Sequence, residues 1–279
     1  MRVVVAGGIL SLMAMLAACQ TPPRQAARGG PPPACSPEKH FRDPAEAMSG
    51  NDRAANLVAL SFMEWDRFGR QTWRYRAGAR DGVETRRGVR ETERPDWVQR
   101  YWRAVGEPRS VEDIPRVAWS AAFVSWIMVQ AGVPTAAFCG APAHSMYLET
   151  IWTRQRRDPA APFALHPPAA IRPSVGDLVC AARRGDDGVL SDIAVGRFRD
   201  PDGRFLPSHC DIVVGVDRGA RRLEAIGGNV ADSVTMSVLD LDAEGFLVVG
   251  RDRERDPRPW IAIVENRYRR DPPPRVALR

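Results

Sequence analysis

Residues 119–128 read Trp-Ser-Ala-Ala-Phe-Val-Ser-Trp-Ile-Met, an apolar segment with helical spacing. Phe123, Trp126 and Ile127 recur at the interval of one helix face, and Gly132 follows the run as a helix stop. A helix that is apolar on most of its sides is expected to be buried in a core. The other elements of the fold should therefore pack around this helix.

Ser120 stands at the start of this helix, and two interpretations of it are open. As an N-cap, its hydroxyl would accept a hydrogen bond from one of the first N–H groups, which have no partner within the helix. As a nucleophile, it would benefit from the field at a helix N-terminus, which favours negative charge. Position alone favours the cap, so residues further along the chain must decide.

Periodicity predicts helices first and strands afterwards. An amphipathic helix is expected over 51–68, capped by Asp52 and stopped by Gly69, and a second helix begins at Asp96. The polar stretch between them, 71–94, shows no clear period. A further helix is expected over 142–156. Strands are expected at 175–180, 209–216, 222–226, 234–239 and 246–250. Helices followed by an antiparallel meander indicate the α+β class.

Composition and spacing exclude several classes of function. The chain has 279 residues and a net charge of +6, but its basic residues are scattered and form no block interleaved with aromatic residues. Nucleic-acid binding is therefore not expected. No His-x-x-x-His or Cys-x-x-Cys spacing occurs, so no metal is expected. No phosphate loop or dinucleotide fingerprint occurs, so no cofactor is expected.

The first residues indicate export. Val3–Leu16 is an apolar run that is too short to span a membrane comfortably, and the small residues after it end at Cys19. Leu-Ala-Ala-Cys resembles the lipobox of bacterial lipoproteins, which implies that Cys19 is lipidated and becomes the mature N-terminus. The alternative is an ordinary signal peptide with a chance cysteine. By the same resemblance, Gln20 in place of aspartate points to the outer membrane, with the protein facing the periplasm.

These features divide the chain into four parts. Residues 1–18 form the expected signal peptide, and 19–37 form a tether rich in Pro, Gly and Arg. Residues 38–265 form the expected α+β domain. The Arg- and Pro-rich residues 266–279 form a flexible tail.

Three residues suited to acyl transfer occur in order along the domain. Ser120 opens the central helix, His209 opens a strand, and Asn229 ends the next strand. A nucleophile needs a base within hydrogen-bond reach, and the base needs a third group that fixes its tautomer. A helix packed on the sheet would bring Ser120 over His209, with Asn229 on the far ring nitrogen. Spacing alone leaves this arrangement open.

Four motifs resemble those of CHAP and NlpC-type papain-like cell-wall hydrolases. Residues 119–126 are similar to their nucleophile helix, in which cysteine stands where this chain has Ser120. The Gly-Asp-Leu-Val of 176–179 resembles one of their strands. The His-Cys-Asp-Ile-Val-Val of 209–214 resembles another, which begins with the general base. The Ala-Ile-Gly-Gly-Asn of 225–229 resembles a strand that ends in Gly-Gly-Asn. The resemblance covers about 65–250 and is closest to the domain-of-unknown-function family numbered 2272, which carries serine at the nucleophile position.

The resemblance implies a papain-like α+β fold and an amidase or endopeptidase acting on peptidoglycan peptides. Ser120 would attack a carbonyl, His209 would move the proton, Asn229 would orient the imidazole, and N–H groups around Ala121 would supply part of an oxyanion hole. Serine ionises less readily than a thiol. Two other functions therefore stay open: a non-catalytic peptidoglycan-binding or scaffold lipoprotein, and an esterase or acyltransferase.

Four further residues are candidates for substrate contact: Trp119, His144, Tyr147 and Asp211. His144, with Tyr147 one turn further on, would line the cleft as a second acid/base or a substrate contact, or it is structural. Asp211 would orient a residue or bind a substrate amine, or it makes a strand-end hydrogen bond. Asp177 in the Gly-Asp-Leu turn is interpreted as a turn former.

Four cysteines remain after Cys19: Cys35, Cys139, Cys180 and Cys210. An oxidising periplasm favours up to two disulfides among them, with three possible connectivities. Cys180 and Cys210 lie on strands that should be neighbours, and a Cys35–Cys139 bond would pin the tether to the domain. Because Cys210 follows His209 on a strand, its side chain should point to the opposite face, which makes it a poor substitute nucleophile.

Overall fold

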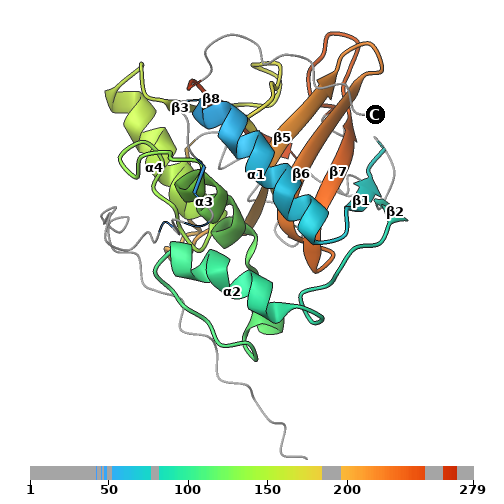
Figure 1. Ribbon diagram of the computed structural model, residues 1–279. Helices are drawn as coiled ribbons and strands as arrows, with labels where there is room; N and C mark the ends of the chain where they lie inside the picture. The colour runs from blue at the N-terminus through green and yellow to red at the C-terminus, as the bar shows by residue number, and fades with distance from the viewer. Residues whose placement is uncertain are drawn as a thin grey trace, which may run out of the picture.

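The computed structural model describes residues 52–76, 82–183, 196–248 and 260–268, together with Arg42, Ala45 and residues 47–48. These residues form a mixed α+β structure with four α-helices and an eight-stranded sheet (Figure 1). The α+β class expected from the order of the elements is therefore confirmed. The expected signal peptide, Cys19 and the tether lie outside the described residues.

Two helices, α1 and α4, begin and end close to their predicted bounds, and α2 begins close to its predicted start. Helix α1 spans Arg53–Arg67, and the Asp52 carboxylate accepts a hydrogen bond from Ala55 N at 2.9 Å, as an N-cap does. Gly69 follows with φ 77°, the left-handed conformation that ends many helices. Helix α2 spans Pro95–Ala104, and α4 spans His144–Arg157.

Helix α3 lies at the centre of the core. It spans Ser120–Gln130, all of its residues are buried, and Gly132 follows it with φ 78° as predicted. Tyr101 of α2 packs on its first turn, with its ring centroid 5.6 Å from that of Trp119 and 5.3 Å from that of Phe123. Aromatic pairs at these distances stabilise a core beyond their buried area alone.

The strands form one sheet in the order β2-β1-β7-β6-β5-β4-β8-β3. Their bounds are β1 Gln71–Arg74, β2 Val83–Arg86, β3 Phe163–His166, β4 Leu178–Ala182, β5 Ser208–Asp217, β6 Arg222–Val230, β7 Ser233–Asp240 and β8 Trp260–Asn266. All pairings are antiparallel except that of β1 with β7, which is parallel. The predicted meander is confirmed for β4 to β7, which are neighbours in sequence order.

The sequence prediction missed four strands and placed one too many. Strands β1 and β2 lie in the stretch that showed no period. Each has only four residues, which gives too few alternations of apolar and polar side chains to detect. Strands β3 and β8 were also missed. The strand expected at 246–250 is wrong over its described part, 246–248, where Leu247 makes only an isolated bridge to Leu241.

A disulfide joins Cys180 and Cys210, which are register partners on β4 and β5. The expected pairing of these two cysteines is confirmed, and Cys210 is fully buried, so it offers no free thiol. Cys139 is also disulfide-bonded, and its expected partner Cys35 lies outside the described residues.

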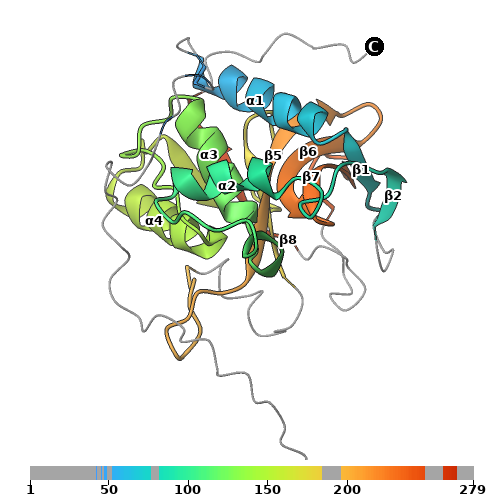
Figure 2. The ribbon, with the colours of Figure 1, turned by 60° about the horizontal axis from the view of Figure 1, so that its bottom comes forward.

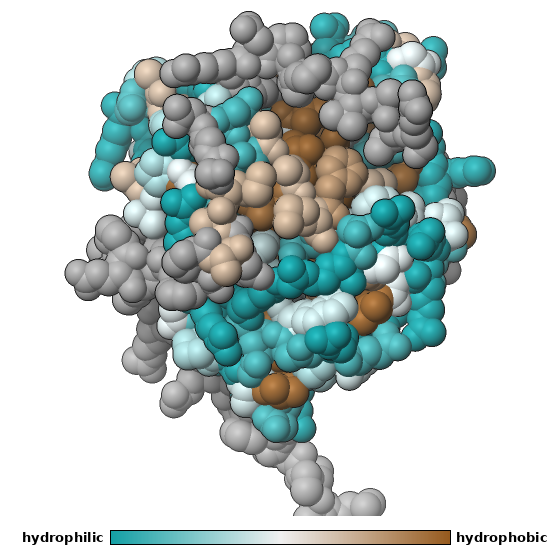
Figure 3. Space-filling model, in the orientation of Figure 1, coloured by the Kyte–Doolittle hydropathy of each residue, from teal (hydrophilic) through white to brown (hydrophobic). Residues whose placement is uncertain are grey.

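The helices gather on one side of the sheet, with α1 lying across β5, β6 and β7 (Figure 1). A second view shows α2, α3 and α4 beside α1 on the same side (Figure 2). Apolar residues form a band on the face that α1 crosses (Figure 3). Met63 of α1 is 55% exposed. No helix in the described ranges is long and apolar enough to cross a bilayer.

Candidate active site

Ser120 is the first residue of α3, and its hydroxyl lies between two imidazole rings. Ser120 Oγ is 2.8 Å from His209 Nδ1 on β5 and 2.8 Å from His144 Nε2 at the start of α4. Trp119, not Ser120, occupies the N-cap position. The capping interpretation of Ser120 is therefore wrong, because its hydroxyl bonds to two side chains from distant parts of the chain.

The second nitrogen of the His209 ring is held by Asp211. Asp211 Oδ1 lies 2.7 Å from His209 Nε2, and Asp211 has no exposed surface. The two residues are two positions apart on β5, so their side chains leave the same face of the strand. Among the alternatives left open for Asp211, its contact fits the one in which it orients another residue, and its complete burial contradicts a solvated charge.

Asn229 does not reach His209. Its Nδ2 donates instead to Glu91 Oε2 at 3.0 Å, so the expectation that Asn229 orients the imidazole is corrected. Asn229 has φ 58°, and the pairing of β6 with β7 shifts register between Gly227 and Val230. The regular alternation of side chains that the prediction assumed therefore ends before Asn229.

Two glycines bring β6 against the site. A Cβ atom at Gly227 would lie 1.7 Å from Asp211 Oδ1 and 3.3 Å from His209 Nε2. A Cβ atom at Gly228 would lie 2.5 Å from the ring of Trp119. The Gly-Gly pair is thus required for close approach of the backbone rather than for backbone flexibility.

The hydrogen-bond partners assign the protons of the site. A carboxylate only accepts, so Asp211 accepts from His209 Nε2–H and leaves Nδ1 free to accept from the Ser120 hydroxyl. The Ser120 hydroxyl thus donates a hydrogen bond to His209 Nδ1, and its oxygen accepts a second hydrogen bond from His144 Nε2–H. His144 Nδ1 then accepts from the hydroxyl of Tyr147, its other partner. Every group in this chain of hydrogen bonds is satisfied by one set of tautomers.

Burial keeps the second imidazole neutral. Burial, the neighbouring His209 and the positive charge of Arg183 lower the pKa of His144 well below its usual value, and only Asp211 opposes them. Burial and the charge of Asp211 raise the pKa of Tyr147 well above its usual value. His144 is therefore uncharged and Tyr147 protonated near neutral pH.

The site is almost fully enclosed. Ser120 is 3% exposed, His144 4% and His209 9%, while Tyr147 has no exposed surface. Trp119, expected to contact substrate, also has no exposed surface and lies in the core against Tyr101. The Ser120 hydroxyl contacts His209 and His144 directly, while Asp211 and Tyr147 hold the far nitrogens of these two rings.

Glu91 is a member of the site that the sequence did not reveal. It is buried, and its Oε2 accepts hydrogen bonds from both Trp119 Nε1 and Asn229 Nδ2. Burial raises the pKa of Glu91, and the Asp232 charge adds to this, while the bonds from Trp119 and Asn229 oppose it. Glu91 lies in a polar stretch without periodicity, so nothing local distinguished it from a solvated charge.

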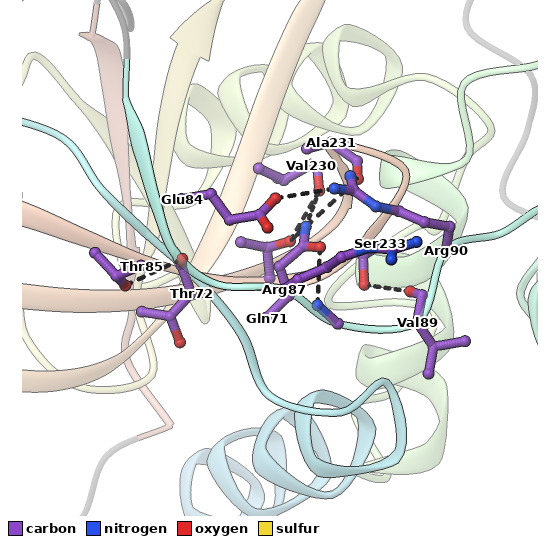
Figure 4. Close-up of polar contacts among 12 residues, drawn as sticks. Gln71, Thr72, Glu84, Thr85, Arg87, Val89, Arg90, Val230, Ala231 and Ser233 are labelled. Atoms are coloured by element: carbon purple, nitrogen blue, oxygen red, sulfur yellow. Dashed lines mark hydrogen bonds and ion pairs between the residues drawn. The ribbon is translucent and has the colours of Figure 1, made fainter.

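A network of polar contacts holds the residues that precede Glu91 in place (Figure 4). The Arg90 guanidinium donates to the carbonyl of Ala231 and to Glu84, and Ser233 Oγ donates to the Val89 carbonyl at 2.7 Å. Gln71 Nε2 donates to the Val230 carbonyl at 2.9 Å. The segment before α2 is thereby tied to the β6–β7 turn, beside the start of α3.

The described ranges contain no group of three or more His, Cys, Asp and Glu side chains placed to hold a metal ion. What the residues present can perform is nucleophilic chemistry: a hydroxyl, a base bonded to it, and a carboxylate that orients the base.

Residues 90–266 match a family model described as "Uncharacterized protein conserved in bacteria (DUF2272)". The match covers more than half of the chain and includes every site residue from Glu91 to Asn229. No curated protein and no solved structure matches the chain.

Proposed function

Because the chain belongs to the DUF2272 family, whose description assigns no activity, we propose its function from the chemistry of the site: a serine acyl hydrolase. The observation that carries the proposal is the position of Ser120 Oγ, 2.8 Å from His209 Nδ1, with Asp211 on the other ring nitrogen at 2.7 Å. These are the contacts of a nucleophile, a general base and an orienting carboxylate.

The reaction follows from these contacts. Ser120 Oγ bonds to the carbonyl carbon of the substrate while His209 Nδ1 takes the hydroxyl proton, and the carbonyl electron pair moves onto oxygen. The imidazolium that forms is stabilised by Asp211. When the bond to the leaving group breaks, His209 returns the proton to it. Water then attacks the acyl-serine with the same base, which releases the acid and restores Ser120.

The orientation of the ring differs from that in chymotrypsin-like proteases, where Nε2 faces serine and Nδ1 faces aspartate. Either direction works, because the carboxylate fixes the tautomer that leaves a lone pair toward the hydroxyl. The serine opens a helix, and N–H groups of a first helical turn have no partners within the helix. The N–H of Ala121 is therefore suited to stabilise the oxyanion.

We propose peptidoglycan peptides as the substrate and a papain-like arrangement as the fold. Support comes from the order of the four motifs that resemble CHAP and NlpC-type hydrolases, and from the nucleophile helix packed on β5 and β6. Support for the location comes from the lipobox-like Leu-Ala-Ala-Cys ending at Cys19. We propose that Cys19 is lipidated and anchors the protein to the outer membrane, facing the periplasm. A Cys19→Ala protein should lose both incorporated fatty acid and membrane fractionation.

A second function, peptidoglycan binding without catalysis, is favoured by the enclosure of the site. Ser120 is only 3% exposed, and serine replaces the more readily ionised thiol of the resembling hydrolases. In that function the polar chain around Ser120 would be a structural element of a binding domain. Pull-down of purified sacculi without release of soluble fragments would support it.

The experiment that separates these functions combines sacculus digestion with a serine-directed probe. The parent protein should release soluble muropeptides and should be labelled at Ser120 by a fluorophosphonate. The Ser120→Ala variant should do neither, while Ser110→Ala, which changes an exposed serine outside the site, should match the parent. Sacculus digestion that survives in Ser120→Ala would contradict the proposal. Hydrolysis of p-nitrophenyl acetate without sacculus digestion would point to an esterase or acyltransferase.

A further inference from the structure

The proposed hydrolysis uses only one of the two imidazoles that contact Ser120. His144 Nε2 lies as close to Ser120 Oγ as His209 Nδ1 does, at 2.8 Å. His144 is the first residue of α4 and is 4% exposed. Its other nitrogen, Nδ1, accepts a hydrogen bond from the hydroxyl of Tyr147, one turn further on. A buried ring held at both nitrogens has a fixed orientation and a fixed tautomer.

The surroundings give the two rings different charges during a reaction. Asp211 contacts His209 directly and stabilises its protonated form. His144 has no such contact: its partners are two hydroxyls, and both His209 and Arg183 oppose a positive charge on it. When His209 takes the proton from Ser120, a second positive ring 5.5 Å away, measured between centroids, is further disfavoured. His209 therefore cycles between two charge states while His144 stays neutral.

We propose that His144 is a second catalytic residue, a neutral imidazole whose Nε2–H stabilises the oxyanion formed when Ser120 attacks, with Tyr147 as the positioning residue that keeps the proton on Nε2. The inference rests on the proposed acyl transfer. In the resting site the Nε2–H bonds to Ser120 Oγ. As Oγ becomes bonded to the carbonyl carbon, the oxygen that gains the electron pair is attached to that same carbon, so the oxyanion forms beside the fixed Nε2–H.

The two histidines have different roles because a neutral imidazole is a much weaker acid than an imidazolium. A neutral imidazole donates a hydrogen bond but does not readily give up its last N–H, so His144 keeps its proton throughout. The leaving group receives its proton from His209, which alone becomes imidazolium. Opposed environments around two titratable groups assign the acid–base role to one and the electrophilic role to the other.

The test uses the rate of fluorophosphonate labelling at Ser120, because the phosphonyl oxygen of this probe occupies the position of the oxyanion. His144→Leu should lower the maximal labelling rate by about 10²–10³-fold, as loss of one oxyanion donor does, with little change in probe affinity. His144→Gln, whose amide N–H replaces Nε2–H, should recover most of the rate. Tyr147→Phe should lose less than His144→Leu. His166→Leu, which changes a histidine on β3 paired with Glu265, should match the parent.

A second measurement reads the tautomer without activity. In ¹⁵N-histidine spectra of the parent protein, His144 should be protonated at Nε2 only, and should remain neutral at the ordinary histidine pKa of 6.5. A charged or Nδ1-protonated His144 at pH 7 overturns the inference. If His144→Leu is labelled as fast as the parent, the role of His144 is overturned while the proposed function stands. A parent that the probe does not label overturns the proposed function and this inference together.

Discussion

His209 Nε2 lies 2.7 Å from Asp211 Oδ1, two residues further along the same strand. Strand geometry alone brings two such side chains to one face, so this contact needs no long-range packing. The neighbouring Gly227 leaves room for it, since any side chain there would collide with the carboxylate. The orienting group of the candidate triad is thus a local feature of β5.

The first prediction concerns the charge of this orienting group. Asp211→Asn should lower fluorophosphonate labelling of Ser120 by about 10³–10⁴-fold, because an amide can donate to Nε2 and leave Nδ1 protonated and unable to accept from serine. Asp217→Asn, at the exposed end of the same strand, is the control and should match the parent.

Asn229→Ala provides the contrast to Asp211→Asn. Since Asn229 bonds to Glu91 and not to His209, its loss should cost less than about tenfold in labelling rate, an indirect effect through the position of Trp119. A loss as large as that of Asp211→Asn would show that Asn229 orients the imidazole after all.

The second prediction concerns the close approach of β6. Gly227→Ala should abolish labelling while the protein remains folded, because the added methyl group must displace Asp211 or the strand. Gly219→Ala is the matched control, since a Cβ atom there meets its nearest neighbour at 3.5 Å. Circular dichroism should show the same secondary structure in both variants. Full activity in Gly227→Ala would refute the tight packing at this position.

The third prediction concerns the buried Glu91. Its pKa is raised in the folded protein above the ordinary value of 4.5, so the stability it contributes is complete below pH 4.5 and is lost as pH rises through the raised pKa. Glu91→Gln keeps an oxygen acceptor for Trp119 and Asn229 but does not titrate. The free energy of unfolding of Glu91→Gln should therefore increase relative to the parent between pH 4 and pH 7.

Urea unfolding at several pH values measures this difference. Glu93→Gln, which changes an exposed glutamate in the same segment, is the control for loss of a carboxylate that is not buried. Glu91→Ala, which removes the acceptor shared by Trp119 Nε1 and Asn229 Nδ2, should destabilise the protein by about 1–3 kcal/mol for each donor left without a partner. A pH-independent difference for Glu91→Gln would contradict the raised pKa.

The fourth prediction concerns the disulfide between β4 and β5. Cys180 and Cys210 are 30 residues apart, and closing a loop of this length stabilises a protein by about 3–4 kcal/mol through the unfolded state. The double variant Cys180→Ala/Cys210→Ala should lose about this much in denaturant unfolding under oxidising conditions. A loss below about 1 kcal/mol would mean that packing, rather than the covalent bond, holds the two strands together.

Much of the fold could be predicted because its signals are local. The apolar face of α1, its Asp52 cap and the glycine stops after α1 and α3 depend only on residues a few positions apart. The β4–β7 meander likewise follows from alternation within each strand. Strands β1 and β2, at one end of the sheet, could not be found this way, because they are short and are held by the parallel contact of β1 with β7, more than 150 residues away.

For the site, the chain order predicted that Ser120 opens a helix and His209 opens a strand, and alternation along β5 places Asp211 on the same face as His209. The contacts of His144 with the Ser120 hydroxyl and of Asn229 with Glu91 exist only once the helices and strands have packed together. Each of these contacts joins separate elements, across 24 residues for His144 and 138 for Asn229. Local periodicity carries no information about such distances, which are set by how α3, α4 and β6 pack together.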